Sequence, residues 1–419
     1  MNFRRCLLMG CIVGSAVLNL SCEEALQPDD PVRIGVLFQT SAAFGPHTRG
    51  AVHAALIVNS HGGVLGRRVE ILVRDDGGRP DTARDAAADL IENEGVVALI
   101  GPLTWPTYFS VYDYASQRGI PVIGIDAGSW DRWSQDTAGG GAFSPRPGNE
   151  RIYRVAARHV STEGLCARAA LLSIPMEGTS SALLVAFEEE LQAPTELVYS
   201  NGMVPANIFD AEEILGPVRD ANPDCVFANA GNDAAWAQLV EGWAAIGGPP
   251  VTFYSLRTRL EASRILQELR DPAIVTGNIE VAQLSNEPES AEWNWFVRSQ
   301  TALFGEPPPQ PWTSDFFDAT AVTLLAIESA GSTSNFEDAL YRVARFDGGA
   351  PSVEVPKAAS DIPSALSFIR SGKDIDYRGP SGSFDLNPET GRMDDAPISF
   401  MEVVDIRTGE RRVLHIERD

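Results

Sequence analysis

"GVVALIGPLTWPTYFSVYDYA", residues 95–115, is the stretch of the chain that decides the fold. It begins as a short apolar run, typical of a buried strand, and then turns at a Gly-Pro pair. Thr104 and Trp105 open a segment with helical spacing, and Pro106 suits a first helical turn because its missing N–H is one that a helix does not use. A strand, a tight turn and a helix form the repeating unit of a parallel α/β sheet.

The same alternation extends outward from this stretch in both directions and predicts a series of βαβ units. Strands are predicted at 32–39, 67–76, 96–102, 120–128, 169–174, 195–200, 225–231 and 251–255, and helices at 47–63, 79–95, 107–119, 151–164, 180–192, 209–223 and 233–248. Residues 136–150 are rich in Gly and Pro and are predicted to be a loop that separates two α/β units. Helices 290–305 and 314–331 follow, the second of them expected on the first unit, and residues 377–417 are predicted to be antiparallel strands.

Length and charge limit the possible functions. At about 150 residues per domain, 419 residues predict two or three compact units. The formal net charge is -24, whereas nucleic-acid binding relies on clustered Lys and Arg that release counterions from phosphates. Nucleic acid is therefore excluded as a partner.

The N-terminal residues have the pattern of an export signal. Two Arg residues precede an apolar run at 6–20, which is shorter than the roughly 20 residues that span a bilayer, so residues 1–21 are predicted to be a cleaved signal peptide. Cys22 ends this run, begins a polar tether at 22–31, and resembles the lipidated cysteine of bacterial lipoproteins. A diacyl anchor on Cys22 would hold the mature domain at a membrane surface. The alternative is an unmodified cysteine near an ordinary cleavage site.

Two cysteines remain in the folded part of the chain, Cys166 and Cys225. In an oxidising compartment such a pair is a disulfide candidate, and both residues precede strand-like runs that a doubly wound sheet can place side by side. The alternative is two small buried thiols.

Six segments together resemble a known family. "IGVLFQTSAAFG", "NSHGGVLGRRVEILVRDDGGRPDTA", "ALIGP", "GIPVI", "DFFDATAVTLLAIESAG" and "YRGPSGSFDLNPETGR" look like successive signature segments of type I periplasmic binding proteins. The most similar branch is the leucine/isoleucine/valine-binding type of ABC transporter substrate-binding lipoproteins. The resemblance implies an α/β fold of two doubly wound parallel-sheet lobes joined by a three-crossing hinge. The expected division is 32–157 for lobe 1, 158–282 for lobe 2, 283–375 for the return to lobe 1, and 376–419 for a β-rich segment at the hinge and lobe 2.

In that family a small ligand lies between the lobes, at the carboxyl ends of the strands, as the general rule for open α/β sheets also requires. The resemblance implies that the helix beginning near residue 104 receives a ligand carboxylate at its N-terminus, with the hydroxyls of Thr104 and Thr107 assisting. The alternative is that one of these threonines merely caps the helix. The other residues predicted to line the site are Phe44, Trp105, Asp126, Ala127, Gly128, Ser129, Met176, Asn232, Asp233 and Arg257, with Glu177 and Ser255 beside them.

Arg257 is a departure from the amino-acid-binding relatives. They usually carry an acidic residue at this point to hold the ligand ammonium, whereas this chain reads "YSLRTR". Either Asp126 or Asp233 replaces that acidic residue, or Arg257 pairs with an acidic group of the ligand, because arginine matches carboxylates in geometry. An ordinary α-amino acid is therefore only one option for the ligand.

Motifs of enzymatic chemistry are not found. The five histidines do not form an H-E-x-x-H pattern or metal-ligand spacing, there is no G-x-S-x-G, and Asp75 and Asp76 are more typical of a turn than of an acid–base pair. No cofactor, metal or catalytic residue is therefore predicted. The expected function is that of a solute-binding protein in the periplasm or at the cell surface, which delivers a small polar ligand to an ABC permease. The alternative is a receptor module of the same fold that signals ligand binding to a partner.

Overall fold

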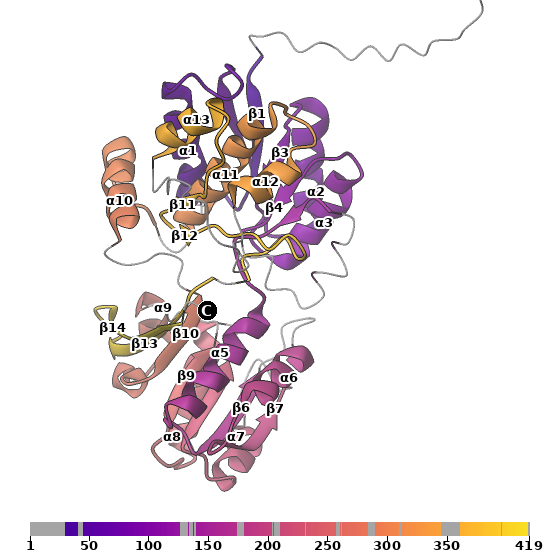
Figure 1. Ribbon diagram of the computed structural model, residues 1–419. Coiled ribbons are helices and arrows are strands. Elements are labelled where there is room, and N and C mark those ends of the chain that lie inside the picture. The colour runs from indigo at the N-terminus through magenta and orange to yellow at the C-terminus, as the bar shows by residue number, and fades with distance from the viewer. Residues whose placement is uncertain are drawn as a thin grey trace, which may run out of the picture.

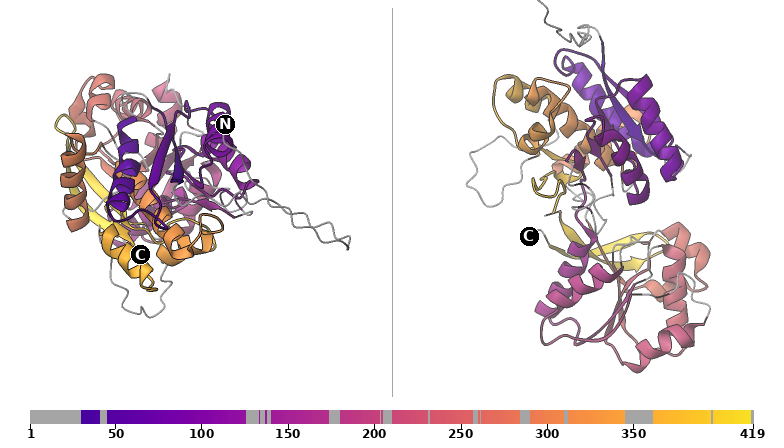
Figure 2. Two further views of the ribbon diagram at one scale, coloured as in Figure 1. Left: turned by 90° about the horizontal axis from the view of Figure 1, so that it is seen from above. Right: turned by 90° about the vertical axis from the view of Figure 1, so that its right-hand side faces the viewer.

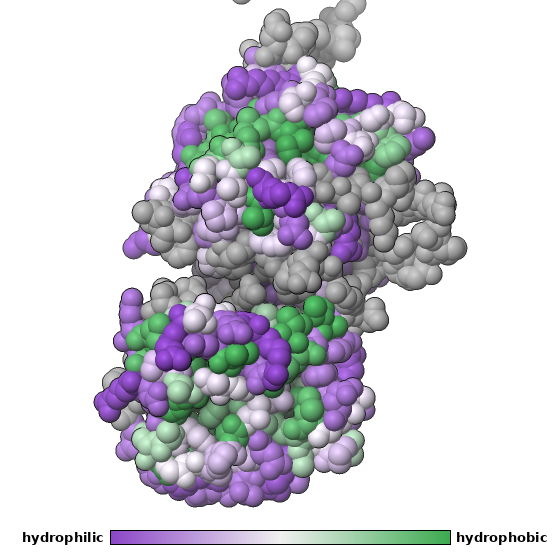
Figure 3. All heavy atoms as spheres, turned by 90° about the vertical axis from the view of Figure 1, so that its left-hand side faces the viewer, coloured by the Kyte–Doolittle hydropathy of each residue, from purple (hydrophilic) through white to green (hydrophobic). Residues whose placement is uncertain are grey.

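The structure, a computed structural model, contains two α/β lobes, one above the other in Figure 1. It describes residues 30–40, 45–125, 133, 137, 140–173, 180–202, 204, 210–230, 232–256, 260, 262–283, 290–309, 312–344, 361–394 and 396–417. Among these residues, no helix is both long and apolar enough to span a bilayer. Apolar and hydrophilic side chains are interspersed over the face of both lobes that Figure 3 shows, as is usual for protein surfaces in water.

The first lobe is built on a parallel sheet of five strands in the order β2-β1-β3-β4-β5. The strands are β1 (Val32–Leu37), β2 (Val69–Arg74), β3 (Ala98–Ile100), β4 (Val122–Ile123) and β5 (Ala142–Phe143). Helices α1 (Arg49–Ser60), α2 (Pro80–Ala88) and α3 (Trp105–Ser116) connect the first four strands; a 3₁₀ turn, Gly45–Thr48, precedes α1, and a π-helical turn, Asp89–Asn93, extends α2. Helices cover both faces of the sheet, which explains why most residues of its strands are apolar.

The fifth strand corrects the prediction that residues 136–150 form a loop throughout. Ala142 and Phe143 pair in parallel with Val122 and Ile123 of β4. Two residues are too few to show a strand period, and the glycines before them give a turn signal. The pairing therefore depends on the neighbouring strand rather than on a local pattern.

The second lobe is built on a sheet of seven strands in the order β14-β13-β10-β9-β8-β6-β7. The strands are β6 (Arg168–Ser173), β7 (Glu196–Asn201), β8 (Cys225–Asn229), β9 (Thr252–Leu256), β10 (Ile279–Gln283), β13 (Ile398–Asp405) and β14 (Glu410–Glu417). The last two are antiparallel to their neighbours, which confirms the antiparallel tail predicted from the sequence. The helices are α5 (Asn149–Thr162), α6 (Ser180–Glu190), α7 (Ala211–Asp220), α8 (Asp233–Ala245) and α9 (Ala262–Glu268), and a 3₁₀ turn, Pro272–Val275, precedes β10.

Alternate residues of the central strands face opposite helix layers of this lobe. In β6, Ala169 and Leu171 pack with α5 and α6, whereas Ala170 and Leu172 pack with α7 and α8. This alternation is what the strand period of two requires of a sheet that is buried on both faces.

Cys166 and Cys225 form a disulfide, so the structure shows the first of the two alternatives for this pair. Cys166 lies just before β6 and Cys225 begins β8, and these two strands are direct neighbours in the sheet. Their Cα atoms are 6.0 Å apart, within the range that a disulfide requires.

The chain passes between the lobes three times: between β5 and α5, between β10 and α10 (Ala291–Phe304), and just before β13. After the second passage, α11 (Thr313–Ala330), α12 (Glu337–Val343) and α13 (Ile362–Arg370) pack on the first sheet, with the short ribbon β11 (Arg378–Gly379) and β12 (Gly382–Ser383) nearby.

Two boundaries differ from those predicted. The apolar face of α5 packs on the second sheet, so the change of lobe comes before Asn149 rather than after residue 157. Tyr377, Phe384 and Met393 belong to the core of the first lobe, so residues 376–419 are divided between the lobes. Burial of apolar side chains, rather than the turn-rich composition of the segment, decides this division.

Candidate ligand site

The Gly-Pro turn after β3 places the start of α3 at the carboxyl edge of the first sheet. Gly101 has a φ of +88°, and a Cβ atom on it would lie 2.1 Å from the carbonyl oxygen of Leu37 in β1. Only glycine therefore fits this position without displacing the neighbouring strand β1. The Gly101 N–H donates to the carbonyl of Ile123, which fixes the turn to the next strand as well.

The two threonines of the motif contact each other at the start of α3. Thr104 occupies the N-cap position and is exposed, yet its side chain accepts no hydrogen bond from the first turn of the helix. Its Oγ1 lies 3.0 Å from Oγ1 of Thr107, and the buried hydroxyl of Thr107 donates to the Thr104 carbonyl at 2.9 Å. Capping by the Thr104 side chain, the alternative considered from the sequence, is therefore not observed.

The start of α3 retains the properties of an anion site because that cap is absent. The N–H groups of the first helical turn have no intrahelical acceptors and carry the positive end of the helix dipole. Trp105, the first residue of the helix, is half-buried. A hydroxyl pair and an aromatic side chain thus lie together at this helix end.

An aromatic cluster follows β1 in the same lobe and was not predicted from the sequence. Phe38 packs edge-on against Phe316 and Trp312, with ring centroids 5.0 and 6.2 Å apart, and Trp312 lies 5.3 Å from the His47 ring. Burial lowers the pKa of His47 to about 4, so this histidine is neutral at pH 7 and contacts Thr313 Oγ1 at 3.1 Å. Trp312 is far from Phe38 in the sequence, so no local pattern indicates the cluster.

Asp75 and Asp76, after β2, form a turn. Asp75 accepts hydrogen bonds from the Gly77 N–H at 2.9 Å and from the Thr40 hydroxyl at 2.7 Å, and these bonds lower its pKa. Asp76 is buried, which raises its pKa, and it accepts from the Gly78 N–H at 2.9 Å. Both carboxylates have the turn role that the sequence favours.

Three buried polar residues lie at the carboxyl ends of adjacent strands in the second lobe. Ser173 of β6 is in register with Asn229 of β8, and Ser255 of β9 is in register with the residue before Asn229. All three are almost completely buried, which is unusual for their residue types. Ser255 is among the predicted residues, whereas Ser173 and Asn229 were missed, although each is a polar residue at the end of an apolar run.

Asn232 and Asp233 begin α8 beyond the end of β8. The Asn232 side chain caps the helix, because its Oδ1 accepts from the Ala235 N–H at 3.0 Å. Asp233 is buried in the first turn, where the helix dipole favours a negative charge.

The structure thus brings Thr104, Trp105 and Thr107 together in the first lobe, and places Asn232, Asp233 and Ser255 in the second. The remaining predicted residues lie outside the described part of the chain: Cys22, Phe44, Asp126, Ala127, Gly128, Ser129, Met176, Glu177 and Arg257. Within the described part, no group of three or more His, Cys, Asp or Glu residues is arranged to hold a metal ion.

Two doubly wound α/β lobes, three connections between them and polar groups at the strand ends are the architecture of type I periplasmic binding proteins. A family model described as periplasmic binding protein matches residues 31–409. The chain therefore belongs to the periplasmic binding protein family, which confirms the resemblance and the fold class predicted from the sequence. Membership implies an extracytoplasmic location and a solute-binding role.

Solved structures with the same fold have low sequence identity to this chain. One is the branched-chain amino acid transporter substrate-binding protein LivJ from Streptococcus pneumoniae, in complex with isoleucine. Its TM-score is 0.68 at 16% identity, and the alignment covers 93% of this chain and 99% of the LivJ chain. The leucine-binding protein LivK from Thermotoga maritima has a TM-score of 0.66 at 16% identity, with 92% and 99% covered. A solute-binding protein of an ABC transporter from R. palustris, in complex with benzoate, has a TM-score of 0.63 at 17% identity, with 93% and 97% covered.

Proposed function

We propose that this protein is a solute receptor that binds a small carboxylate-bearing ligand between its lobes and delivers it to an ABC permease. The observation that carries the proposal is the start of α3, where Thr104 leaves the first turn uncapped and lies 3.0 Å from the hydroxyl of Thr107. A helix N-terminus of this kind stabilises an anion through its N–H groups and its dipole.

The ligand body would lie against apolar side chains beside this helix end. Trp105 begins the helix, and Trp312 is half-buried at the edge of the aromatic cluster of the first lobe. Isoleucine and benzoate, the ligands in two of the similar structures, each combine a carboxylate with an apolar group. The proposal therefore covers amino acids and related carboxylates, including aromatic ones.

The second lobe would contact the opposite side of the ligand. Ser173, Asn229 and Ser255 are polar residues at adjacent strand ends, and Asp233 and Arg257 are proposed to contact the charged groups of the ligand. Contacts from both lobes stabilise the closed arrangement, so ligand binding shifts the hinge equilibrium toward closure. A permease can then distinguish the loaded receptor from the empty one.

We also propose that a lipid on Cys22 holds the receptor at the membrane, where the permease lies. The tether at 22–31 would then separate the folded lobes from the membrane surface. Metabolic labelling with a fatty acid tests this part separately: Cys22→Ser is expected to abolish the label, and a label that persists contradicts the anchor.

The test of the receptor proposal is a thermal-shift screen of the purified protein with amino acids, aliphatic carboxylates and aromatic carboxylates. A ligand that binds only the folded state raises the unfolding midpoint. Thr107→Val in combination with Thr104→Ala is expected to weaken the response to any such ligand at least tenfold in concentration. Thr162→Ala is the matched control, since Thr162 is an exposed residue at the end of α5. Equal responses from the double variant and the control would contradict the proposal.

A further inference from the structure

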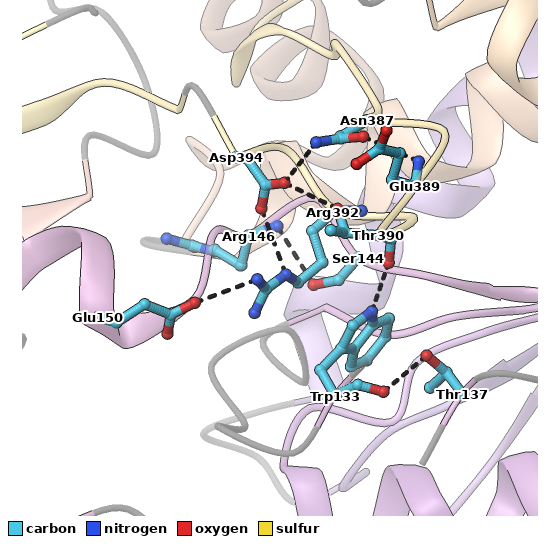
Figure 4. A network of polar contacts seen from close by, with 10 residues as sticks. All are labelled: Trp133, Thr137, Ser144, Arg146, Glu150, Asn387, Glu389, Thr390, Arg392 and Asp394. Carbon is cyan, nitrogen blue, oxygen red and sulfur yellow. Dashed lines mark hydrogen bonds and ion pairs between the residues drawn. The ribbon is translucent and has the colours of Figure 1, made fainter. Parts of the chain in front are cut away.

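Two of the three connections between the lobes run side by side and are hydrogen-bonded to each other (Figure 4). The N–H of Ser144, in the first connection, donates to the Gly391 carbonyl at 2.9 Å, and the Met393 N–H donates to the Ser144 carbonyl at 3.2 Å. Gly391 has a φ of +69°, and a Cβ atom there would lie 2.4 Å from the carbonyl oxygen of Ala142. The close approach of the two connections therefore depends on this glycine.

Side chains fix both connections to the first lobe. Arg146, in the first connection, forms a buried ion pair with Asp315 of α11, with Nη2 and Oδ2 3.2 Å apart. Asp394, in the third connection, accepts hydrogen bonds from Asn387 and Thr390, each at 2.8 Å, which close a compact loop on the same lobe. The first-lobe ends of these connections are thus held in place.

One ion pair spans from this fixed part to the second lobe. Nη2 of Arg392 lies 3.1 Å from Oε1 of Glu150, and the same guanidinium lies 3.3 Å from Asp394. Glu150 belongs to the first turn of α5, which packs on the second sheet. The Arg392 side chain is only 10% exposed and that of Glu150 is 33% exposed, so solvent screens the pair incompletely. A rotation of the second lobe changes the separation of these two charges.

Three other polar atoms at the same hinge have no hydrogen-bond partner in the described part of the chain. They are Nε of Arg146, Nδ2 of Asn149 and Oε2 of Glu150, and all three are buried. A buried polar atom without a partner is costly, so these atoms favour any rearrangement that supplies partners. The hinge therefore combines an ion pair that reaches the second lobe, Arg392–Glu150, with several buried polar atoms that have no hydrogen-bond partner in the described part of the chain.

We propose that the Arg392–Glu150 ion pair is a hinge stop: it stabilises the lobe arrangement of Figures 1 and 2, and it breaks when the lobes close. Glu150 and Arg392 act as positioning residues, because they are proposed to set the lobe arrangement and not to touch a ligand. Closure releases Glu150 to new partners, together with the unpaired atoms of Arg146 and Asn149. The consequence for affinity rests on the proposed receptor function: any factor by which the stop lowers the closed population lowers ligand affinity by the same factor.

The test measures distances between the lobes by pulsed electron paramagnetic resonance, without any ligand. Spin labels on non-natural residues, which leave the Cys166–Cys225 disulfide intact, are placed at exposed positions in two pairs. The first pair joins Asp85 of α2 to Glu188 of α6, and the second joins Arg298 of α10 to Glu268 of α9. The two pairs lie on different sides of the waist in Figure 1, so closure shortens at least one distance.

Glu150→Gln keeps the shape of the side chain and removes its charge. It is expected to raise the population of the shorter distance about tenfold over that of the wild type, the size of effect typical of a charge-assisted hydrogen bond. Glu189→Gln is the matched control, because Glu189 forms its ion pair with Arg154 at 2.7 Å within the second lobe. This control is expected to leave both distances unchanged.

Arg392→Gln removes the other charge and is expected to shift the same distance in the same direction, which keeps the test valid if one variant fails to fold. Distances in the folded variants that match those of the control, or that lengthen in both pairs, would overturn the hinge stop. Neither result bears on whether the protein binds a carboxylate, so the failure of this inference is distinguishable from failure of the proposed function.

Discussion

The first turns of α3 and α8 lie in equivalent places in the two lobes, each after a central parallel strand, but their polar groups are used differently. Asn232 accepts a hydrogen bond from the first turn of α8, whereas Thr104 makes no such bond to α3 and contacts Thr107 instead. Helices α7, α10 and α13 also begin with side chains that cap them, Asp210, Ser290 and Asp361. Helices α1, α2, α5, α11 and α12 also begin without a side-chain cap, so the uncapped start of α3 supports the proposed anion site only together with its hydroxyl pair and its place at the carboxyl edge of the first sheet.

The lobes also differ in what fixes their interiors. In the second, a disulfide joins the regions of two neighbouring strands. In the first, α11 buries Asp318, whose carboxylate accepts hydrogen bonds from the Tyr377 hydroxyl at 2.6 Å and from the N–H and hydroxyl of Ser381. Burial raises the pKa of Asp318 to about 7, while these hydrogen bonds act against the shift. The stability of the first lobe therefore depends on an ionisable group, the Asp318 carboxyl, whereas the second lobe is cross-linked by a covalent bond.

The largest expected difference between the lobes is a pH dependence of the stability of the first lobe. The folded-state pKa of Asp318 lies above its unfolded value of 3.8, so its contribution to stability is complete below pH 4 and is lost as the pH rises through 7. The size of the change is on the order of a few kcal/mol. Asp318→Asn is expected to flatten the fall of the unfolding midpoint between pH 4 and 7.

Asp338→Asn is the control for this experiment, since it makes the same change at an exposed position of α12. Burial lowers the pKa of His47 and of His53 to about 4, so these two groups oppose the Asp318 effect in the wild type. The difference between variant and wild type cancels them. Parallel midpoint curves for the two variants would show that Asp318 does not carry the dependence.

The second effect tests the uncapped helix directly. Thr104→Asp supplies α3 with a capping carboxylate and places a negative charge where the ligand carboxylate is proposed to bind. Binding of any carboxylate found in the screen is expected to weaken about a hundredfold, measured by isothermal titration calorimetry. Undiminished affinity would mean that the ligand lies elsewhere.

The third effect concerns the capped helix. Asn232→Ala removes a side chain that accepts from Ala235, and loss of such a cap costs about 1 kcal/mol. Hydrogen exchange of the amides in the first turn of α8 is expected to accelerate accordingly, because local opening governs their protection. Unchanged exchange there would contradict the capping role.

The smallest expected effect is that of Thr104→Ala on α3. Because the Thr104 side chain makes no capping bond, the local stability of the helix is expected to change by less than about 0.5 kcal/mol, well below the cost usual for an N-cap. The same hydrogen-exchange experiment measures it. A loss as large as that of Asn232→Ala would remove the contrast between the two helices.

Much of the fold is predictable from the sequence because the spacing of apolar residues along a long segment shows which face of that segment is buried. The strands from β1 to β4 and the helices between them follow from apolar runs and helical spacing, and the antiparallel tail follows from its turn signals. The two-residue strand β5 and the start of the second lobe at α5 do not, because each depends on which distant residues cover it. The disulfide does not follow from the sequence alone, because Cys166 and Cys225 come within bonding distance only through the pairing of β6 with β8.

The residues of the candidate site differ in the same respect: some are neighbours in the sequence, and others are brought together only by the fold. Thr104, Trp105 and Thr107 are neighbours in a recognisable strand-turn-helix motif, so the sequence brings them together without knowledge of the fold. Trp312 meets Phe38 and His47 only through the return of α11 to the first lobe. Ser173 and Asn229 become neighbours only through the parallel pairing of β6 and β8.

The most direct test of the account compares matched carboxylate and amide ligands. Unfolding midpoints are measured for the purified protein with isoleucine and isoleucinamide, with benzoate and benzamide, and with equivalent pairs for any other carboxylate found in the screen. At least one carboxylate is expected to raise the midpoint while its amide leaves the midpoint unchanged. Equal shifts from the two members of every pair would contradict a helix N-terminus that binds an anion.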